Sequence, residues 1–284
     1  MTWSTIGFEP QKRYFSDILK KNRLLHAYLF SGPEMIGKKR FVNELYRFAN
    51  PASSDSFDAD LMVVGPRVNE GESKIYIDDI REVNMFLSRK PLVGPYKFVI
   101  IDEADQLTLE ASNALLKILE EPPSYGVLVL VSSQSKQLLP TIASRCQEFQ
   151  FLPHSRETIK KVLASKKSDP SIAELITEIS GGRLGWAIKI VESGLAEDIQ
   201  SAIRDFQKLP TQGVAQRLGY AKKLYEKETY VPTVDYWLRW AHAHLIDLQN
   251  SSHALRGLLK LHYAISQPQY SHRLALERFL LDLA

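Results

Sequence analysis

The stretch AYLFSGPEMIGKK, residues 27–39, joins a short apolar run to a glycine-bounded loop that ends in two lysines. The apolar run predicts a strand at 27–30, and helical spacing of apolar residues predicts a helix over 38–49. A strand, a glycine loop and a helix in this order are the context in which a backbone loop binds phosphate. In such a loop Gly32 and Gly37 let N–H groups turn inward, and Lys38 can reach the outer phosphates.

The next residue departs from this pattern. A phosphate loop has Ser or Thr after the lysine because the hydroxyl ligates Mg²⁺, whereas this chain has Lys39. A cation in place of a metal ligand would hold Mg²⁺ poorly and repel it. Two interpretations stay open: a weak nucleotide site, or a glycine turn that binds nothing productively.

Strands and helices alternate outward from this loop as far as about residue 153. The continuous apolar runs at 98–101 and 127–131 are typical of strands buried on both faces of a parallel sheet. The pattern therefore predicts an α/β domain with a P-loop-type parallel sheet. The remaining predicted strands are 61–64 and 148–151, and the helices are 10–22, 78–88 and 111–121.

Two further features carry possible phosphate chemistry. Asp102 and Glu103 follow the strand at 98–101, and in phosphoryl-transfer sites an acid in this place anchors Mg²⁺ while its neighbour orients water. Ser144, Arg145 and Cys146 end the segment that follows the strand at 127–131. An arginine near a domain edge can stabilise a phosphate held by a neighbouring subunit, or it can form an ordinary surface ion pair.

Strand patterns end after Pro153, and the rest of the chain is predicted to be helical. Short helices are expected at 156–166, 171–180 and 184–191, with longer amphipathic stretches from 199 onward. We therefore predict three domains: an α/β domain at 1–153, a small helical domain at 154–195 and an all-helical domain at 196–284.

Composition excludes several classes of protein. The single cysteine, Cys146, rules out a disulfide framework and any zinc site built from several cysteines. The first residues lack a signal-peptide pattern, and the longest apolar run, 126–131, is too short to span a membrane. We expect a cytoplasmic protein that has no membrane partner.

The net charge of +3 is unevenly distributed. Residues 1–150 carry 18 Lys and Arg against 19 Asp and Glu, a charge of −1, and residues 151–284 carry 18 against 14, a charge of +4. This imbalance is too mild to indicate nucleic-acid binding by itself, so direct DNA binding by the helical half stays an alternative.

Taken in order, these segments resemble the clamp-loader branch of the AAA+ proteins. The likeness covers most of residues 1–150 and is strongest in the run NALLKILEEPP at 113–123. The other matching blocks are HAYLFSGP at 26–33, IYIDDIR at 75–81, IDEAD at 101–105 and LPTIASRC at 139–146.

The resemblance implies an assembly that uses ATP to open a ring-shaped sliding clamp and load it at primer–template DNA. Its partners would be clamp-loader motor and delta subunits and the sliding clamp, with DNA met through the assembled complex. Ser144 and Arg145 match the family's arginine-finger motif, in which the arginine acts in trans on an adjacent subunit's ATP. By the same resemblance, the domain at 154–195 would be a helical lid, and the domain at 196–284 would be a collar that holds the ring of subunits together.

Three departures distinguish this chain within the family. Lys39 replaces the metal-ligating Ser or Thr, Gly185 aligns with a nucleotide-sensing arginine, and residues 50–55 lack the cysteines of the usual zinc module. Arg183 could replace the sensing arginine only in a shifted alignment. The departures imply a non-motor subunit that assists a neighbour's hydrolysis, requires no cofactor and binds no zinc. A motor subunit that hydrolyses ATP despite Lys39 is the alternative.

Overall fold

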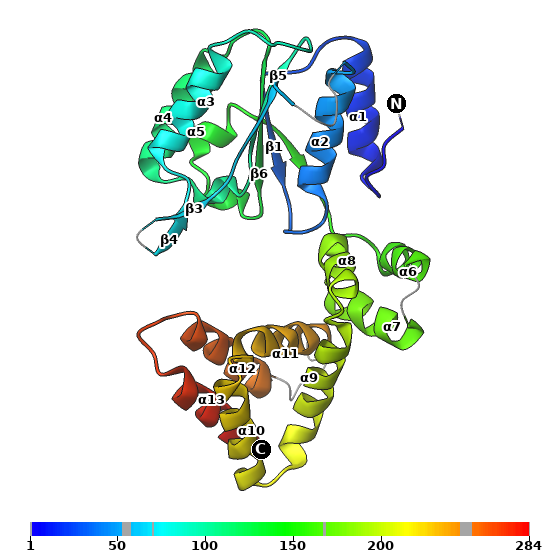
Figure 1. The fold of residues 1–284 in the computed structure, drawn as a ribbon, viewed down its shortest axis with the longest axis vertical. Helices are drawn as coiled ribbons and strands as arrows, with labels where there is room; N and C mark the ends of the chain where they lie inside the picture. Colours follow the sequence, from blue (N-terminus) through cyan, green and yellow to red (C-terminus); the bar gives the residue numbers. More distant parts are fainter. Residues whose placement is uncertain (1, 53–57, 70, 167–168, 245–251, 284) are drawn as a thin grey trace. The chain divides into compact units, whose positions relative to one another are not determined.

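The computed structural model describes residues 2–52, 58–69, 71–166, 169–244 and 252–283 (Figure 1). The chain divides into two compact units, Met1–His154 and Ser155–Ala284. The division falls one residue from the predicted end of the α/β domain. Of the segment without zinc-module cysteines, residues 53–55 lie outside the described part of the chain.

The first unit is built on a five-stranded parallel sheet with strand order β2-β5-β6-β1-β7. All residues of β1, β5 and β6 are buried, as the continuous apolar runs predicted. The predicted α/β fold with a P-loop-type parallel sheet is therefore confirmed. The strands are β1 (Ala27–Ser31), β2 (Leu61–Val64), β5 (Lys97–Ile101), β6 (Gly126–Ser132) and β7 (Gln147–Gln150).

Helices cover both faces of this sheet (Figure 1). Tyr28 and Phe30 belong to the apolar cluster with α1 and α2, whereas Leu29 between them belongs to the cluster with α3, α4 and α5. This alternation follows from the two-residue period of a strand. The helices are α1 (Glu9–Lys20), α2 (Lys38–Ala49), α3 (Ile77–Leu87), α4 (Leu109–Glu120) and α5 (Pro140–Ala143), and short 3₁₀ turns span Ala104–Gln106 and Ser135–Gln137.

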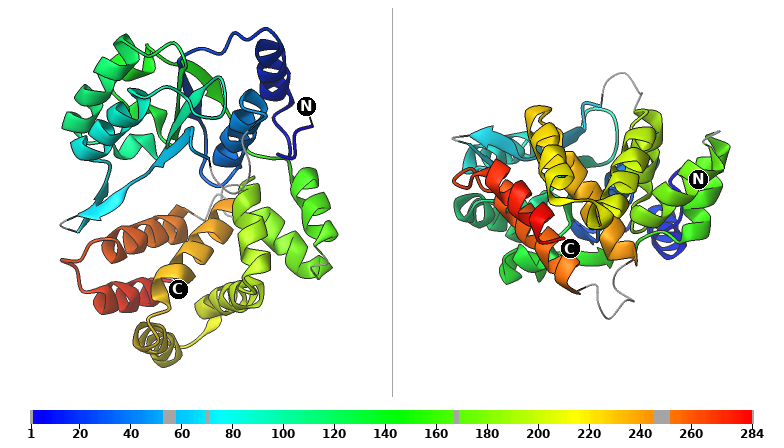
Figure 2. Two further views of the ribbon diagram at one scale, coloured as in Figure 1. Left: turned by 45° about the horizontal axis from the view of Figure 1, so that its top comes forward. Right: turned by 90° about the horizontal axis from the view of Figure 1, so that it is seen from below.

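Two local features differ from the sequence-based prediction. An antiparallel hairpin, β3 (Arg67–Asn69) with β4 (Glu72–Lys74), was not predicted, because its short strands are largely exposed and lack an apolar alternation. The hairpin extends away from the sheet (Figure 2). Helix α4 begins two residues before the predicted start because the Thr108 hydroxyl accepts a hydrogen bond from the Ala111 N–H (3.2 Å) and caps the helix.

The second unit is helical and contains two apolar clusters. The buried residues of one cluster lie between residues 159 and 203, and those of the other lie between residues 206 and 283. Helix α9 contributes Ile199 and Ile203 to the former and Phe206 to the latter, so it belongs to both. The division into lid and collar stays a prediction. The helices are α6 (Arg156–Ser165), α7 (Pro170–Ile179), α8 (Leu184–Glu192), α9 (Ala196–Lys208), α10 (Val214–Glu226), α11 (Tyr230–His244), α12 (Ser252–Ile265) and α13 (His272–Leu281), with a 3₁₀ turn at Leu209–Thr211.

Trp237 in α11 is fully buried, and its indole N–H donates to the Ala202 carbonyl (2.9 Å). The aromatic side chains of α11 therefore form a packing face at this point. Within the described ranges, no helix is both long and apolar enough to cross a lipid bilayer.

A buried carboxylate organises the loop that leads into β5. Asp60 accepts backbone N–H bonds from Leu92 and Val93 (2.7 Å each) and from Gly94 (3.0 Å). Although burial opposes ionisation, these bonds and the nearby Lys97 hold the pKa of Asp60 below its usual value.

We expect Asp60→Asn to lower the free energy of unfolding by about 2 kcal/mol or more at neutral pH, because an amide NH₂ would face backbone donors. A depressed folded-state pKa stabilises the fold above the unfolded pKa, and this contribution is lost as pH falls through the folded pKa. The difference in free energy of unfolding between wild type and variant, measured by urea unfolding, should therefore narrow as pH falls below about 3.9, the ordinary pKa of an aspartate in an unfolded chain. A gap that is independent of pH would contradict this role.

Candidate functional site

The loop between β1 and α2 has the backbone of a phosphate loop. Gly32 and Gly37 adopt φ values of 139° and 111°, a region that side chains strongly disfavour. At Gly32 a Cβ atom would also lie 2.1 Å from the Phe151 carbonyl oxygen. Thus only glycine fits where the loop leaves the sheet.

Lys38 is buried at the start of α2. Its Nζ donates to the backbone carbonyls of Gly32 and Pro33, the latter at 2.6 Å. The ammonium group is therefore bonded to the loop's own backbone, at the position from which a lysine of this pattern would reach a phosphate.

Lys39 forms an ion pair with Asp102, with Nζ 2.9 Å from Oδ2. Asp102 follows β5 and is the acid expected to anchor Mg²⁺, and Lys39 occupies the position of the hydroxyl ligand. Both protein groups of that metal site are thus engaged with each other. An ammonium bonded to the carboxylate repels a divalent cation, so the residues present do not fit Mg²⁺.

The acidic side chains beside this pair differ in environment. Glu103 has a left-handed backbone (φ 51°), and its pKa is raised by partial desolvation and by the charges of Asp102 and Glu34. Asp105 accepts hydrogen bonds from the Ser132 hydroxyl (2.5 Å) and the Ser133 N–H (3.0 Å). Against the effect of burial, these bonds lower the pKa of Asp105. Asp105 thereby joins the ends of β5 and β6, a link that the sequence analysis missed.

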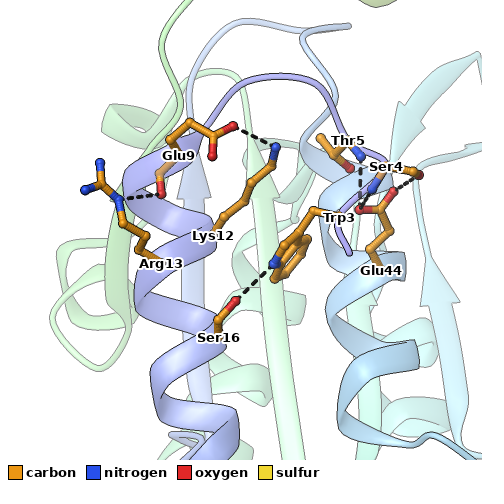
Figure 3. A network of polar contacts seen from close by, with 8 residues as sticks. All are labelled: Trp3, Ser4, Thr5, Glu9, Lys12, Arg13, Ser16 and Glu44. Atoms are coloured by element: carbon orange, nitrogen blue, oxygen red, sulfur yellow. Dashed lines mark hydrogen bonds and ion pairs between the residues drawn. The ribbon is translucent and has the colours of Figure 1, made fainter. Parts of the chain in front are cut away.

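The segment before α1 is tied to α2 near the loop (Figure 3). The Glu44 carboxylate accepts the N–H groups of Ser4 (3.0 Å) and Thr5 (3.1 Å), and also the Ser4 hydroxyl. Despite partial desolvation, these donors hold the pKa of Glu44 below its usual value. In the same network, the Trp3 indole N–H donates to the Ser16 hydroxyl of α1 (3.1 Å).

The end of the first unit also contacts the loop. His154 Nε2 lies 2.8 Å from the Ile36 carbonyl oxygen, and its ring lies 4.9 Å from the ring of Phe8. The sequence pattern contained no signal for this contact, because His154 lies far along the chain from the loop.

The Ser144–Cys146 segment follows α5, and each of its side chains has a different environment. The Ser144 hydroxyl donates to the Thr141 carbonyl (3.2 Å), which holds the turn. Cys146 packs partly buried against the core, and burial raises the pKa of its thiol to about 12, so it is not a thiolate at neutral pH. Arg145 is exposed, and it contacts Glu120 and Thr141.

Arg145 and the phosphate loop lie at opposite ends of the parallel strands. β1 and β7 are parallel and pair from Tyr28 with Gln147 to Ser31 with Gln150. The loop follows the carboxyl end of β1, whereas Arg145 precedes the amino end of β7. The two ends of a five-residue strand such as β1 are about 16 Å apart. Arg145 therefore does not contribute to the phosphate loop of its own chain.

In the second unit, Gly185 lies in the first turn of α8 and Arg183 is the N-cap residue of that helix. The position aligned with a sensing arginine thus carries no side chain. Among the described residues, no cluster of three or more His, Cys, Asp or Glu side chains could hold a metal ion.

Comparisons with known proteins agree with this architecture. DNA polymerase III subunit delta' of Pseudomonas aeruginosa is 29% identical over 221 residues, which cover 72% of this chain and 67% of the relative. Subunit delta' of Bacillus subtilis is 33% identical over 177 residues, 57% of this chain and 53% of the relative. Subunit tau/gamma of Haemophilus influenzae is 30% identical over 208 residues, 69% of this chain.

The chain spans less than two thirds of two of these relatives, 53% of the Bacillus subtilis protein and 28% of the Haemophilus influenzae protein. A solved structure of a DNA polymerase III gamma subunit-related protein from Thermotoga maritima shares the fold, with a TM-score of 0.58 at 21% identity. The structural match covers 95% of this chain and 98% of the Thermotoga protein.

The family described as "DNA polymerase III, delta subunit" matches residues 8–155, more than half of the chain. The matched range includes the phosphate loop, the acidic residues that follow β5 and the segment around Arg145. The chain therefore belongs to this family, within the clamp-loader branch of the AAA+ proteins.

Proposed function

We propose that this chain is a non-motor, delta-prime-like subunit of the DNA polymerase III clamp loader, which supplies Arg145 as an arginine finger to a neighbouring ATPase subunit. The observation that carries the proposal is the location of Arg145. An exposed guanidinium at the amino end of the strands, opposite its own phosphate loop, can approach a phosphate held by another subunit. There its fixed positive charge would stabilise the charge that develops on the transferred phosphoryl group.

The Lys39–Asp102 ion pair (2.9 Å) supports the non-motor assignment. Hydrolysis in a phosphate-loop enzyme needs Mg²⁺, held through a hydroxyl and an acid of this kind. Here the ammonium of Lys39 replaces the hydroxyl and neutralises the acid. We infer that the chain's own site does not turn over ATP and requires no cofactor.

The proposed partners are the motor and delta subunits of the loader and the sliding clamp, with primer–template DNA met through the assembled complex. Direct DNA binding by the helical half is less well supported. Lys160 of α6 pairs with Glu174 of α7, and Lys166, which directly follows α6, pairs with Glu192 of α8, both at 2.6 Å. Paired lysines attract phosphates less strongly than free ones.

The alternative is a motor subunit, favoured by the 30% identity to the Haemophilus influenzae tau/gamma subunit. Lys38→Met, which keeps an apolar stem in the buried position, separates the two. If the chain is a non-motor subunit, the purified wild-type chain shows no Mg²⁺-dependent ATP turnover, and the variant leaves the turnover of the assembled loader unchanged. Turnover by the wild-type chain that Lys38→Met abolishes would establish the motor assignment. Thermal unfolding of the variant is the control for folding.

A further inference from the structure

Two acceptors in the same chain hold the guanidinium of Arg145. Nη2 donates to Glu120 Oε1 at 2.8 Å, and Nη1 donates to the Thr141 carbonyl oxygen at 3.0 Å. The side chains of Arg145 and Glu120 are 38% and 51% exposed, so the contact lies on the surface of the first unit.

Both acceptors belong to backbone that has little freedom. Glu120 is the last residue of α4, directly before Glu121 and two prolines at 122–123. Thr141 lies in α5, which begins with Pro140. Because proline fixes φ and bars further helix, the backbone that carries the two acceptors is well defined.

The contact is not explained by stability. An acid at the carboxyl end of a helix is unfavourable because the helix dipole places negative charge there. An ion pair this exposed also contributes little to folding, since water screens it. Glu120 thus occupies a position that disfavours a carboxylate, and it contacts the one arginine to which we assign a role.

We propose that Glu120 is a positioning residue for Arg145, an inference that rests on the proposed function. An arginine has five N–H donors, and the contacts with Glu120 and Thr141 use two of them. The remaining donors are free to face an anionic oxygen of the neighbouring subunit's nucleotide. Holding the long side chain in advance reduces the entropy lost when that phosphate is engaged.

The test uses the clamp loader reconstituted from this full chain and its motor subunits. Glu120→Ala should lower kcat for ATP about tenfold and leave KM for ATP unchanged, because the guanidinium is displaced while the neighbour's nucleotide site is intact. Glu120→Gln should restore kcat to within about twofold, since its amide oxygen can accept the same hydrogen bond. A purely structural role would not produce this pairing of a kcat loss with rescue by the amide.

Glu121→Ala is the matched control, because it removes the same charge from the adjacent position at the end of α4. It should retain wild-type kcat. Wild-type or faster turnover in Glu120→Ala, while Arg145→Ala is slow, would overturn the inference and leave the proposed function intact. Equal losses in Glu120→Ala and Glu121→Ala would also overturn it. If Arg145→Ala itself turns over at the wild-type rate, the proposed function fails instead.

Discussion

Replacing Arg145 with alanine is expected to lower the clamp- and DNA-stimulated ATP turnover of the assembled loader by about 10³-fold or more. The guanidinium lies at the amino end of the parallel strands, away from the phosphate loop of its own chain. In the alanine variant its positive charge would be lost from the neighbouring subunit's transition state. Because the loss concerns the transition state, kcat should fall while KM for ATP changes little. Steady-state kinetics on the reconstituted loader measure both constants.

Two further variants define the origin of the effect. Arg145→Lys keeps the charge but loses the planar fork of donors, so its turnover should fall between those of wild type and alanine. Arg13→Ala removes an exposed arginine from α1 of the same unit and should have no effect. Wild-type turnover in Arg145→Ala would rule out the finger assignment, provided that the variant assembles normally.

Replacing Lys39 with threonine is expected to create Mg²⁺-dependent ATP binding in the purified chain. The substitution frees the Asp102 carboxylate from the ion pair (2.9 Å) and supplies a hydroxyl at the position of the metal ligand. At a nucleotide concentration a hundredfold above Kd, linkage predicts about 2.7 kcal/mol of stabilisation in the variant. Thermal unfolding with ATP, with and without Mg²⁺, measures the gain, and wild type should show no dependence on the metal.

Lys39→Met is the matched control for this gain, since it removes the charge without supplying a hydroxyl. It should bind Mg²⁺ and nucleotide more weakly than the threonine variant. Adding Asp102→Asn to Lys39→Thr should abolish the gain, because the carboxylate is then absent. Stabilisation by ATP that is equal in wild type and Lys39→Thr would contradict the inference that the Lys39–Asp102 ion pair prevents Mg²⁺ from binding.

Elements with a strong apolar pattern were predictable from the sequence. The buried strands β5 and β6 contain continuous apolar runs, and their ends differ from the prediction by at most one residue. The β3–β4 hairpin was missed because exposed three-residue strands carry no such pattern. In the second unit the sequence indicated helices from 199 onward but not their bounds, since connected amphipathic helices share one apolar period.

The candidate site was predictable in its residue types and only partly in its contacts. Lys39 was identified because a cation stood where the pattern requires a hydroxyl, and the ion pair with Asp102 agrees with that chemistry. The contact between Glu120 and Arg145 was missed, although both lie in segments that were singled out. They are 25 residues apart in sequence, and no local spacing links them.

The sequence by itself determined the alternation of buried strands and helices, the glycine loop, the lysine in place of a metal ligand and the presence of Arg145. These are properties of residue type and local spacing, to which backbone geometry and chemistry respond directly. Only the tertiary structure decided that Arg145 lies opposite its own loop and beside Glu120. The parallel register of β1 and β7 and the packing of α4 near α5 bring distant segments together, and such contacts depend on the whole fold.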